Sequence, residues 1–522
     1  MSVEYFNTRN LDYVTRDTRS VRLIVSAFLV LLLICALASC SYVNSAREIS
    51  TERNGTTLIV KKGGDFQAAL NKAKPGDTIT LEAGARFLGA FKLPNKSGAD
   101  FITIRSSAQD SDLPPEGTRI DPIRYSSLLP KIESNVKGEP AIAASSGAHH
   151  FRFVAVEFGP TIGGLYDIIQ IGTSEETRVE DLPHHIEFDR VYIHGSNAEG
   201  QRRGIAANGR NIVVKNSYIS DIKRKGEESQ AIAAWASDGP IEIVNNYLEA
   251  AAENILFGGA GSTLKLVPTD CIVRGNHLNK PVEWQSEPWV VKNLFEVKNG
   301  RRIKIENNLM TNNWSMGQDG FGVLFTTRAD NGAASIIDDI EFTGNIVRGS
   351  GGGVNVYGDE GGGGHKLRIT NNIFDDISGP KWKSDGHFMK VTTWNGLVVE
   401  KNTILQSGSI ILAYGKPVTG FVFRDNIAFH NLYGIFGDSL GTGAKAISTY
   451  FPGGTVTNNI IIGGDSSLYR EKNIFVPTIK QVGFENINVR DYRLGKQSPY
   501  LNKGAGGRQI GADLDTKAIG GT

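Results

Sequence analysis

Two charged residues, Glu296 and Lys298, stand two positions apart in the apolar segment LFEVKN, and they share a face if that segment is a strand. This spacing puts them about 7 Å apart, close enough for a carboxylate and an amine to act on one ligand. Arg328 follows the related segment GVLFTT, and Glu253 precedes the segment NILFGG. Such a set could move a proton or neutralise an anion, and Glu253 with Glu296 could hold a cation between neighbouring strands. The alternative is a surface ion pair of little energetic consequence.

Related segments place aromatic and amide side chains on the same expected face. Alternation predicts that this face carries Asn208, Trp235, Glu296, Lys298, Thr326, Asn355, Tyr357, Lys390, Tyr414 and Asp438. The candidate ligand-binding residues are Trp235, Gln230, Asn355, Tyr357, Lys390 and Trp314. Exposed Trp beside polar groups suits stacking on the apolar face of a sugar ring. The alternative is that the Trp in the long loops, such as Trp314, fasten those loops to the body of the protein.

The elements that position these residues can be recognised from a sequence repeat. An asparagine follows a short apolar segment about every thirty residues. The repeated residues are Asn216, Asn246, Asn276, Asn308, Asn345, Asn372, Asn402, Asn426 and Asn459. A strand, a fixed Asn and a second strand at this period indicate a solenoid in which Asn amides bond along the stack. The sequence therefore predicts a parallel β-helix in which these Asn are structural.

Each repeat contains three strands. Strand one carries the candidate residues, strand two precedes the Asn, and strand three follows it. Alternation along strand one turns Ile205, Ala207, Ile232, Ala234, Phe295, Val297, Val354 and Val356 toward the core. The β-helix is expected over residues 58–515, with a tail at 516–522. An α-helix capped by Asp65 is expected to cover the first rung.

The first forty residues have the features of an export segment. Arg19 and Arg22 precede about seventeen apolar or small residues that end at Cys40. Leu37-Ala38-Ser39-Cys40 resembles a bacterial lipobox, in which Cys40 would be lipidated after cleavage; the alternative is an uncleaved membrane anchor. Both interpretations place a polar tether, 41–57, and the repeats outside the cytoplasm, attached to the cell envelope.

Composition excludes several classes of function. The formal net charge is +1, and no basic stripe with interleaved aromatics is present, so we expect no nucleic-acid partner. Of the three cysteines, only Cys271 lies in the body, which rules out a disulfide framework there. We expect a monomer.

The repeats resemble the right-handed β-helix proteins of the pectate-lyase-like superfamily. The resemblance is carried by the strand–Asn–strand units and by the opening QAALNKAKPGDTITLEAG, which is similar to that of chondroitinase-B and alginate-lyase-like enzymes. The nearest likeness is to uncharacterised bacterial secreted β-helix proteins with segments like SQAIAAW and VKNLFEVKN. The resemblance implies an all-β chain that forms a single right-handed parallel β-helix with an Asn ladder and an N-terminal capping helix.

For function, the resemblance implies an exported protein that acts on polysaccharide at the outward face of strand one. Lyases of this superfamily use a Lys or Arg base, further cations and often Ca²⁺, because β-elimination beside a uronate carboxylate develops negative charge. On that basis Lys298 is the expected base, Arg328 the neutralising cation, and Glu296 with Glu253 the ligands of a bound Ca²⁺. The chondroitinase-type signature and the polygalacturonase residues are missing. A glycoside hydrolase and a non-catalytic glycan-binding surface protein therefore stay open.

Two histidine pairs, His149-His150 and His184-His185, have the look of metal ligands. Adjacent residues on a regular strand point to opposite faces, so we expect these pairs to mark the beginnings of strands rather than to bind a metal.

Overall fold

The computed structural model describes residues 55–470, 472–516 and 519. These residues belong to one compact unit, Gly55–Thr522. The expected signal or anchor, the lipidation of Cys40 and most of the tether lie outside the described residues. Within the described residues, every helix is too short or too polar to cross a membrane.

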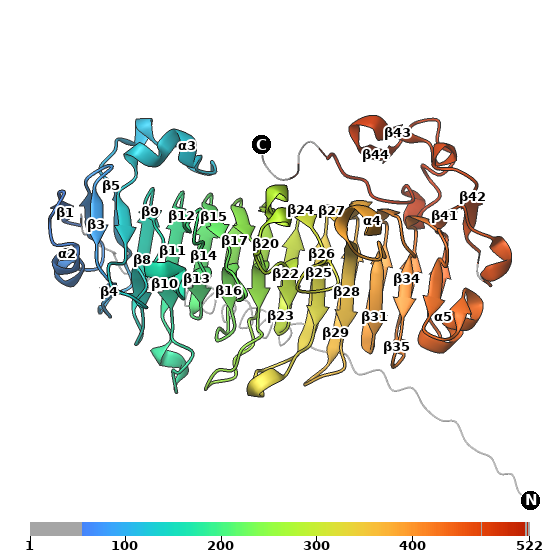
Figure 1. Cartoon of the computed structure of the whole chain (residues 1–522), viewed down its shortest axis with the longest axis horizontal. Coiled ribbons are helices and arrows are strands. Elements are labelled where there is room, and N and C mark those ends of the chain that lie inside the picture. Colours follow the sequence, from blue (N-terminus) through green and yellow to red (C-terminus); the bar gives the residue numbers. More distant parts are fainter. Residues whose placement is uncertain (1–54, 471, 517–518, 520–522) are drawn as a thin grey trace, which may run out of the picture. The chain divides into compact units, whose positions relative to one another are not determined.

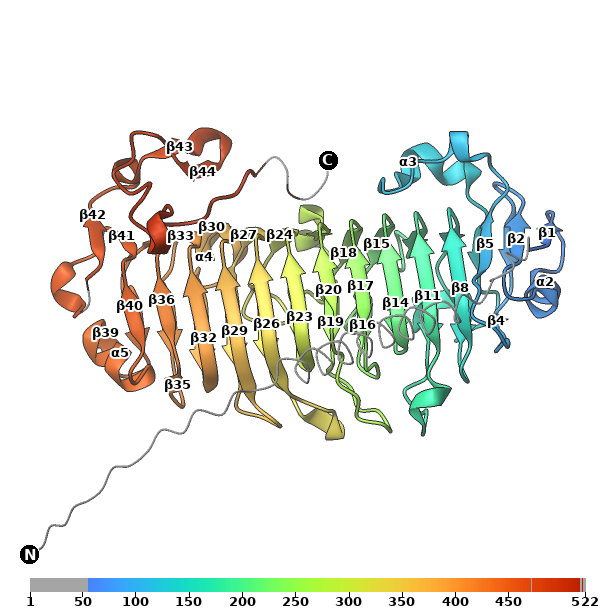
Figure 2. The same cartoon turned by 180° about the vertical axis from the view of Figure 1, so that it is seen from behind.

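The described chain is a coil of three parallel sheets, one for each strand of the repeat (Figures 1 and 2). The strand-one sheet contains β4 (Phe91–Leu93), β7 (Ile142–Ala144), β10 (Asp167–Ile171), β13 (Arg203–Ala207), β16 (Gln230–Ala234), β19 (Glu253–Phe257), β22 (Asn293–Val297), β25 (Phe321–Thr326), β28 (Gly352–Tyr357), β31 (Met389–Thr392), β34 (Ile411–Ala413), β38 (Ile435–Gly437) and the antiparallel β39 (Gly441–Thr442).

The strand-two sheet lies on the side seen in Figure 2. It contains β1 (Thr57–Val60), β2 (Thr78–Leu81), β5 (Ile102–Ser106), β8 (His149–Val154), β11 (His184–Asp189), β14 (Arg210–Lys215), β17 (Ile241–Val244), β20 (Ile272–Arg274), β23 (Gly300–Glu306), β26 (Ile337–Thr343), β29 (Gly364–Thr370), β32 (Trp394–Glu400), β35 (Val418–Thr419), β36 (Val422–Arg424) and β40 (Thr455–Thr457).

The strand-three sheet closes the coil. It contains β3 (Arg86–Leu88), β6 (Lys131–Glu133), β9 (Glu157–Phe158), β12 (Tyr192–His194), β15 (Tyr218–Ile222), β18 (Tyr247–Ala250), β21 (His277–Asn279), β24 (Leu309–Asn313), β27 (Ile346–Ser350), β30 (Ile373–Ile377), β33 (Thr403–Gln406), β37 (Ile427–Phe429), β41 (Ile460–Ile462) and β42 (Ile474–Val476). A separate antiparallel pair joins β43 (Phe484–Asn486) to β44 (Asp491–Leu494).

Helices are few in the described chain and lie at its ends or in its loops: α2 (Phe66–Lys72), α3 (Pro122–Tyr125), α4 (Gly379–Trp382) and α5 (Ala444–Tyr450). The expected capping helix is α2, whose first turn is capped by Asp65 through a bond from the Ala68 backbone N–H. Phe66 and Leu70 of α2 are buried in the core beside the first rung. The predicted right-handed parallel β-helix, with its N-terminal cap, is confirmed.

The core lies between the three sheets and follows the predicted alternation. All eight residues expected to point inward are buried in one continuous apolar cluster: Ile205, Ala207, Ile232, Ala234, Phe295, Val297, Val354 and Val356. Each rung therefore stabilises the next by removing apolar surface from water, and the opposite side chains of strand one are left to face outward.

The Asn ladder begins one rung later than predicted and extends one rung further. From Asn246 onward each Asn Nδ2 donates to the next Asn Oδ1 at 2.9–3.2 Å, ending at Asn473. Asn216 is not in this column, because its backbone adopts a left-handed conformation and its amide bonds Asp189 and Asn245 instead. Ser217 takes the ladder position on that rung, and its N–H donates to Asn246 Oδ1.

The strand-two sheet contains bulges where its strands begin. His150 and His185 have φ values of 58° and 52°, and the ladder between β8 and β11 pairs the residues on either side of them but leaves these two out. A bulge breaks the alternation, so His149 and His150, like His184 and His185, are both partly exposed on the outer face. The prediction that adjacent histidines point to opposite faces is therefore wrong.

Candidate functional site

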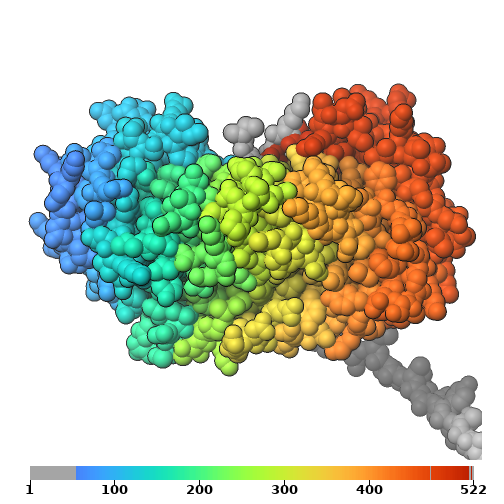
Figure 3. All heavy atoms as spheres, viewed as in Figure 1, coloured from blue at the N-terminus to red at the C-terminus, as the bar shows by residue number. Residues whose placement is uncertain are grey.

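A polar groove of about 550 Å³ lies on the outer face of the strand-one sheet. Its floor is formed by β22, β25, β28, β31 and β34, which are neighbours in the sheet (Figure 1); Figure 3 shows the same face with all atoms. The lining residues are Glu228, Lys292, Glu296, Lys298, Gly317, Gln318, Asp319, Phe321, Leu324, Thr326, Arg328, Asp330, Asn355, Tyr357, Lys390 and Tyr414. The three predicted catalytic residues, Lys298, Arg328 and Glu296, thus come together in one groove.

Glu296 is fixed in the floor of this groove. Its side chain is only 1% exposed, although it points to the outer face of β22. Asn293 Nδ2 donates to its Oε2 at 2.9 Å, and Thr326 donates to its Oε1 at 3.0 Å. Lys298 Nζ lies 3.9 Å from the same Oε1, beyond hydrogen-bond range. Glu296 is therefore an anchored anion beside Lys298.

A buried charge cluster lies next to this pair. Lys292 Nζ contacts Glu253 Oε1 and Glu228 Oε1, each at 2.8 Å, and Gln230 Nε2 donates to Glu253 Oε2 at 2.9 Å. Burial raises the pKa of Glu253 against the opposing effect of the Lys292 ammonium. Burial also lowers the pKa of Lys292, but the carboxylates of Glu253, Glu296 and Glu228 outweigh it, and the net shift is upward. Lys292 is therefore held as a cation at neutral pH.

The residues expected to hold Ca²⁺ do not fit such an ion here. Glu296 pairs in register with Leu256 rather than with Glu253, so the two carboxylates are not stacked. The oxygens of Glu253 already bind Lys292 and Gln230, and those of Glu296 bind two other side chains. Ca²⁺ takes six to eight oxygen ligands, whereas the oxygens of these two carboxylates are already taken by the Lys292 ammonium and by amide and hydroxyl donors.

The rim of the groove carries two more cations beside aromatic rings. The Arg328 guanidinium lies 4.8 Å from the Tyr357 ring centroid and binds Glu360 at 2.8 Å. Lys390 Nζ lies 5.5 Å from the Tyr414 ring centroid and binds Asp319 at 2.9 Å. Asp319 is two-thirds exposed, so its pair with Lys390 can yield to a ligand at little cost. Glu360 is partly buried and also accepts from the Ala329 backbone N–H, so Arg328 is held more firmly.

Asn355 lies on β28 in the groove floor, between Leu324 of β25 and Lys390 of β31. Its Oδ1 is buried and has no hydrogen-bond partner among the described residues. A buried acceptor without a donor costs about 1–3 kcal/mol, so a ligand that donates a hydrogen bond there would be favoured.

Three predicted binding residues lie outside the groove. Gln230 is buried, and it bonds Glu253 and Arg203, so it supports the charge cluster instead of forming a wall. Trp235 is half-buried beneath the Arg203 guanidinium, 4.7 Å from the ring centroid, three rungs from β25. Trp314 is 2% exposed, which leaves no face for a sugar ring.

The loop tryptophans pack against one another beside α4, which contains Trp382. Trp284, Trp289, Trp314 and Trp382 form one buried cluster with Ala251 and Val291. The Lys223 ammonium, itself 2% exposed, lies 4.8 Å from the Trp284 ring and 5.1 Å from the Trp289 ring. The assignment of Trp314 to substrate binding is therefore wrong, because this cluster fastens the loops to the coil.

Sequence reasoning missed Lys292 and Glu228. Lys292 directly precedes β22, whose five residues are all buried, and Glu228 lies in the loop before β16. The one signal in the sequence is that Lys292 stands immediately before the largely apolar strand that contains Glu296, where a lysine needs a carboxylate partner.

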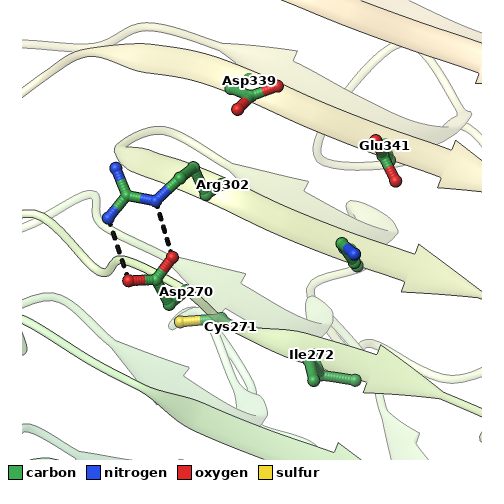
Figure 4. Close-up of a pocket in the computed structure, with 7 residues that line it drawn as sticks. Asp270, Cys271, Ile272, Arg302, Asp339 and Glu341 are labelled. Atoms are coloured by element: carbon green, nitrogen blue, oxygen red, sulfur yellow. Dashed lines mark hydrogen bonds and ion pairs between the residues drawn. The ribbon is translucent and has the colours of Figure 1, made fainter. Parts of the chain in front are cut away.

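A second hollow lies on the strand-two sheet (Figure 4). Its lining is Asp270, Cys271, Ile272, Arg302, Lys304, Asp339 and Glu341. Arg302 and Asp270 form an ion pair at 2.6 Å with both side chains more than half exposed. Burial raises the pKa of the Cys271 thiol to about 12, which suppresses the thiolate that a nucleophile needs. Cys271 is therefore not suited to act as a nucleophile in this hollow.

Comparison with solved structures finds β-helix proteins of several functions. The chain is 13% identical to the polysaccharide lyase family 6 alginate lyase AlyGC, with a TM-score of 0.46 over 89% of this chain and 58% of AlyGC. It is 12% identical to the catalytic unit of the GH87 α-1,3-glucanase from Streptomyces thermodiastaticus strain HF3-3, with a TM-score of 0.48 over 82% and 71% of the two chains. It is 11% identical to the Dettilon tailspike protein, with a TM-score of 0.34 over 80% and 68%.

No protein-family model and no curated protein matches the chain. The chain spans less than two thirds of AlyGC, and identities this low bear on the fold alone. The three sheets and their register define the class: this is a right-handed parallel β-helix protein.

Proposed function

We propose that the groove on the strand-one sheet binds an acidic polysaccharide and cleaves it by β-elimination, with Lys298 as the base. The observation that carries this proposal is the position of Lys298. It is an amine in a polar groove whose one ion pair within the described chain is long, 3.9 Å, while Lys292, Arg328 and Lys390 are each bound at 2.8–2.9 Å. An amine without a close acid partner is free to meet a substrate proton.

The reaction balances with the residues present. Lys298 takes the C5 proton beside the uronate carboxylate, the bond from C4 to the glycosidic oxygen breaks, and a C4=C5 double bond forms. The leaving oxygen takes a proton from water, and the hydroxide that remains takes the proton from Lys298, which regenerates the amine. The negative charge that develops on the uronate is stabilised by the cations at the rim, Arg328 first and Lys390 beside it.

The proposal assigns no role to Ca²⁺. Lys292 supplies a fixed positive charge at the place where Glu253 and Glu296 suggested a metal, and its ammonium is held at 2.8 Å from Glu253. Activity is therefore expected to be the same with added Ca²⁺ and with EDTA.

The substrate would be met outside the cytoplasm. This part of the proposal depends on the expected export segment at residues 1–40, with Cys40 lipidated or the segment kept as an anchor. The coil would then work as a monomer attached to the cell envelope.

The test is an ultraviolet assay of the full chain against a panel of uronate polysaccharides, with reducing ends and retention on immobilised glycan measured in parallel. A lyase produces a 4,5-unsaturated end that absorbs in the ultraviolet. New reducing ends without this absorbance would indicate a hydrolase instead. Retention on a glycan without new ends would indicate a binding protein, and each of these outcomes would overturn the proposal.

A further inference from the structure

Four histidines from two neighbouring rungs meet on the strand-two sheet, on a different face of the coil from the groove. His149 and His150 begin β8, His184 and His185 begin β11, and the parallel ladder pairs His149 with His184. The two strands lie side by side in Figure 2. All four side chains are partly exposed, so the cluster is open to solutes.

The rings form two parallel stacks. The His149 and His184 rings are 4.6 Å apart at 3°, and the His150 and His185 rings are 4.4 Å apart at 7°. Within each pair the rings are nearly perpendicular, at 85° and 80°. The bulges at His150 and His185 make this arrangement possible, because they turn two consecutive side chains to one face.

Ring nitrogens of the two stacks face one another. The Nδ1 atoms of His149 and His150 are 2.7 Å apart, and those of His184 and His185 are 2.8 Å apart. Ring nitrogens of His149, His150 and His184 all lie within 4.8 Å of one another. Two ring nitrogens 2.7–2.8 Å apart either share one proton in a hydrogen bond or turn their lone pairs toward a common cation.

The cluster disfavours protonation. Burial, then the charges of His149, His185, His150 and Arg210, lower the pKa of His184 to about 4. Burial is also the first cause of the lowered pKa of His149, His150 and His185. At neutral pH the rings are therefore uncharged, which is the form that binds a metal.

The backbone of Lys96 raises the pKa of His149, which opposes the larger effect of burial. The charged neighbours have opposite effects on the pKa values of the histidines. Asp100 raises the pKa of His150 and Glu187 raises that of His185, whereas Arg210 on the next rung lowers the pKa of His185. Phe101 covers the other side of His150, with the ring centroids 5.2 Å apart.

We propose that the cluster of His149, His150, His184 and His185 binds one divalent first-row transition-metal ion and thereby ties two N-terminal rungs together. Imidazole nitrogens without a carboxylate select ions such as Zn²⁺, Cu²⁺ or Ni²⁺ and not Ca²⁺ or Mg²⁺. Small rotations of the rings bring the nitrogens to the usual separation of about 2.0–2.1 Å from such an ion.

The experiment uses the full chain, stripped with a chelator and titrated calorimetrically with Zn²⁺ alone and with Cu²⁺ alone. We expect saturable binding of one ion per chain, tighter for Cu²⁺, and a rise in the unfolding midpoint with Zn²⁺. The electron paramagnetic resonance spectrum of the Cu²⁺ form should show several nitrogen ligands, a readout that needs no variant.

The variants are His149→Gln and His184→Gln, with His365→Gln as the matched control. His365 is a single, partly exposed histidine before the bulge residue of β29, on the same sheet. Loss of an outer-sphere partner costs about 10–100-fold in metal affinity, so loss of a ligand should cost at least that much, while the control should bind normally. Absence of saturable binding by the unaltered chain, or equal affinity in all three variants, would refute the site and leave a stack of hydrogen-bonded imidazoles.

Discussion

The outer faces of the strand-one and strand-two sheets both carry many charges, but they hold them differently. On the strand-one sheet, Glu253 is fully buried and bound by Lys292, and Glu296 is buried beside them. On the strand-two sheet, Asp270 and Arg302 form their pair in open solvent (Figure 4). Solvent screens the second pair, whereas the first has given up its hydration and depends on its partners.

This difference shows why a row of charges along a β-helix is weak evidence of function. Both faces have acids and bases at similar spacing in the sequence. On the strand-one face, the buried carboxylates of Glu253 and Glu296 are anchored beside a lysine, Lys298, whose one ion pair within the described chain is long, at 3.9 Å. Function is therefore expected where charge pairing is incomplete in a desolvated place.

The largest effect is expected from Lys298→Ala, compared with Lys304→Ala on the strand-two sheet. Removal of a general base lowers the rate by about 10²–10⁴-fold, so kcat on the active polysaccharide should fall by that factor. Lys304→Ala removes an exposed lysine and should leave kcat unchanged. Equal activity in the two variants, measured by the ultraviolet assay, would remove Lys298 from the mechanism.

A smaller but clear effect is expected on stability from Lys292→Met, compared with Asp270→Asn. Breaking a buried ion pair leaves Glu253 uncompensated and typically costs about 3–5 kcal/mol, whereas the exposed Asp270–Arg302 pair should contribute nothing measurable. Urea unfolding of the two variants checks this. The double change Lys292→Met with Glu253→Gln should recover part of the loss; a double variant no more stable than Lys292→Met would contradict the pairing.

A few-fold effect is expected from Tyr357→Ala, compared with Phe101→Ala. Tyr357 supports Arg328 at 4.8 Å, and Phe101 lies beneath Arg152 at 4.4 Å on the strand-two sheet. Cation–π contacts at exposed sites are worth about 0.5–1 kcal/mol, so KM should rise a few-fold in Tyr357→Ala, and kcat should also fall a few-fold because Arg328 stabilises the developing charge. Steady-state kinetics in which Phe101→Ala shifts KM equally would place the effect outside the groove.

A pH dependence of stability is expected from Lys280, a buried lysine near the charge cluster. Its Nζ donates to backbone carbonyls and to Asn254, and burial lowers its pKa from 10.5 to about 7. Between those values the unfolded chain binds more protons, so the free energy of unfolding should rise with pH from about 7 to 10. Lys280→Met should lose this slope, and Lys304→Met, which alters an exposed lysine, should keep it. The measurement is the free energy of unfolding in urea at several pH values between about 7 and 10, and an equal slope in the two variants would contradict the prediction.

The repeat made most of the fold predictable from sequence. A strand–Asn–strand unit fixes the ladder, and the ladder fixes which side chains face outward, so Glu296, Asn355, Tyr357 and Lys390 are found where alternation placed them. The prediction for Asn216 was wrong by one residue. On that rung Asn216 occupies the left-handed position and Ser217 the ladder position, and the spacing of the repeat does not distinguish these two positions.

The other differences arise from contacts that no periodicity encodes. The position of Trp314 depends on how several loops from different rungs pack against one another. The partner of Lys292 lies in a loop 64 residues away in sequence, and that pairing exists only after the rungs stack. The histidine pairs depend on a single backbone angle at each bulge, which alternation cannot supply.

The Asn ladder separates two kinds of sequence change. Its bonds keep nearly the same length whether the next Asn lies 24 or 37 residues along the chain. Insertions and deletions in the loops can therefore reshape the walls of the groove while its floor keeps its register. In evolutionary terms, such a coil can exchange one ligand for another by changing loop length alone, without first losing a folded intermediate.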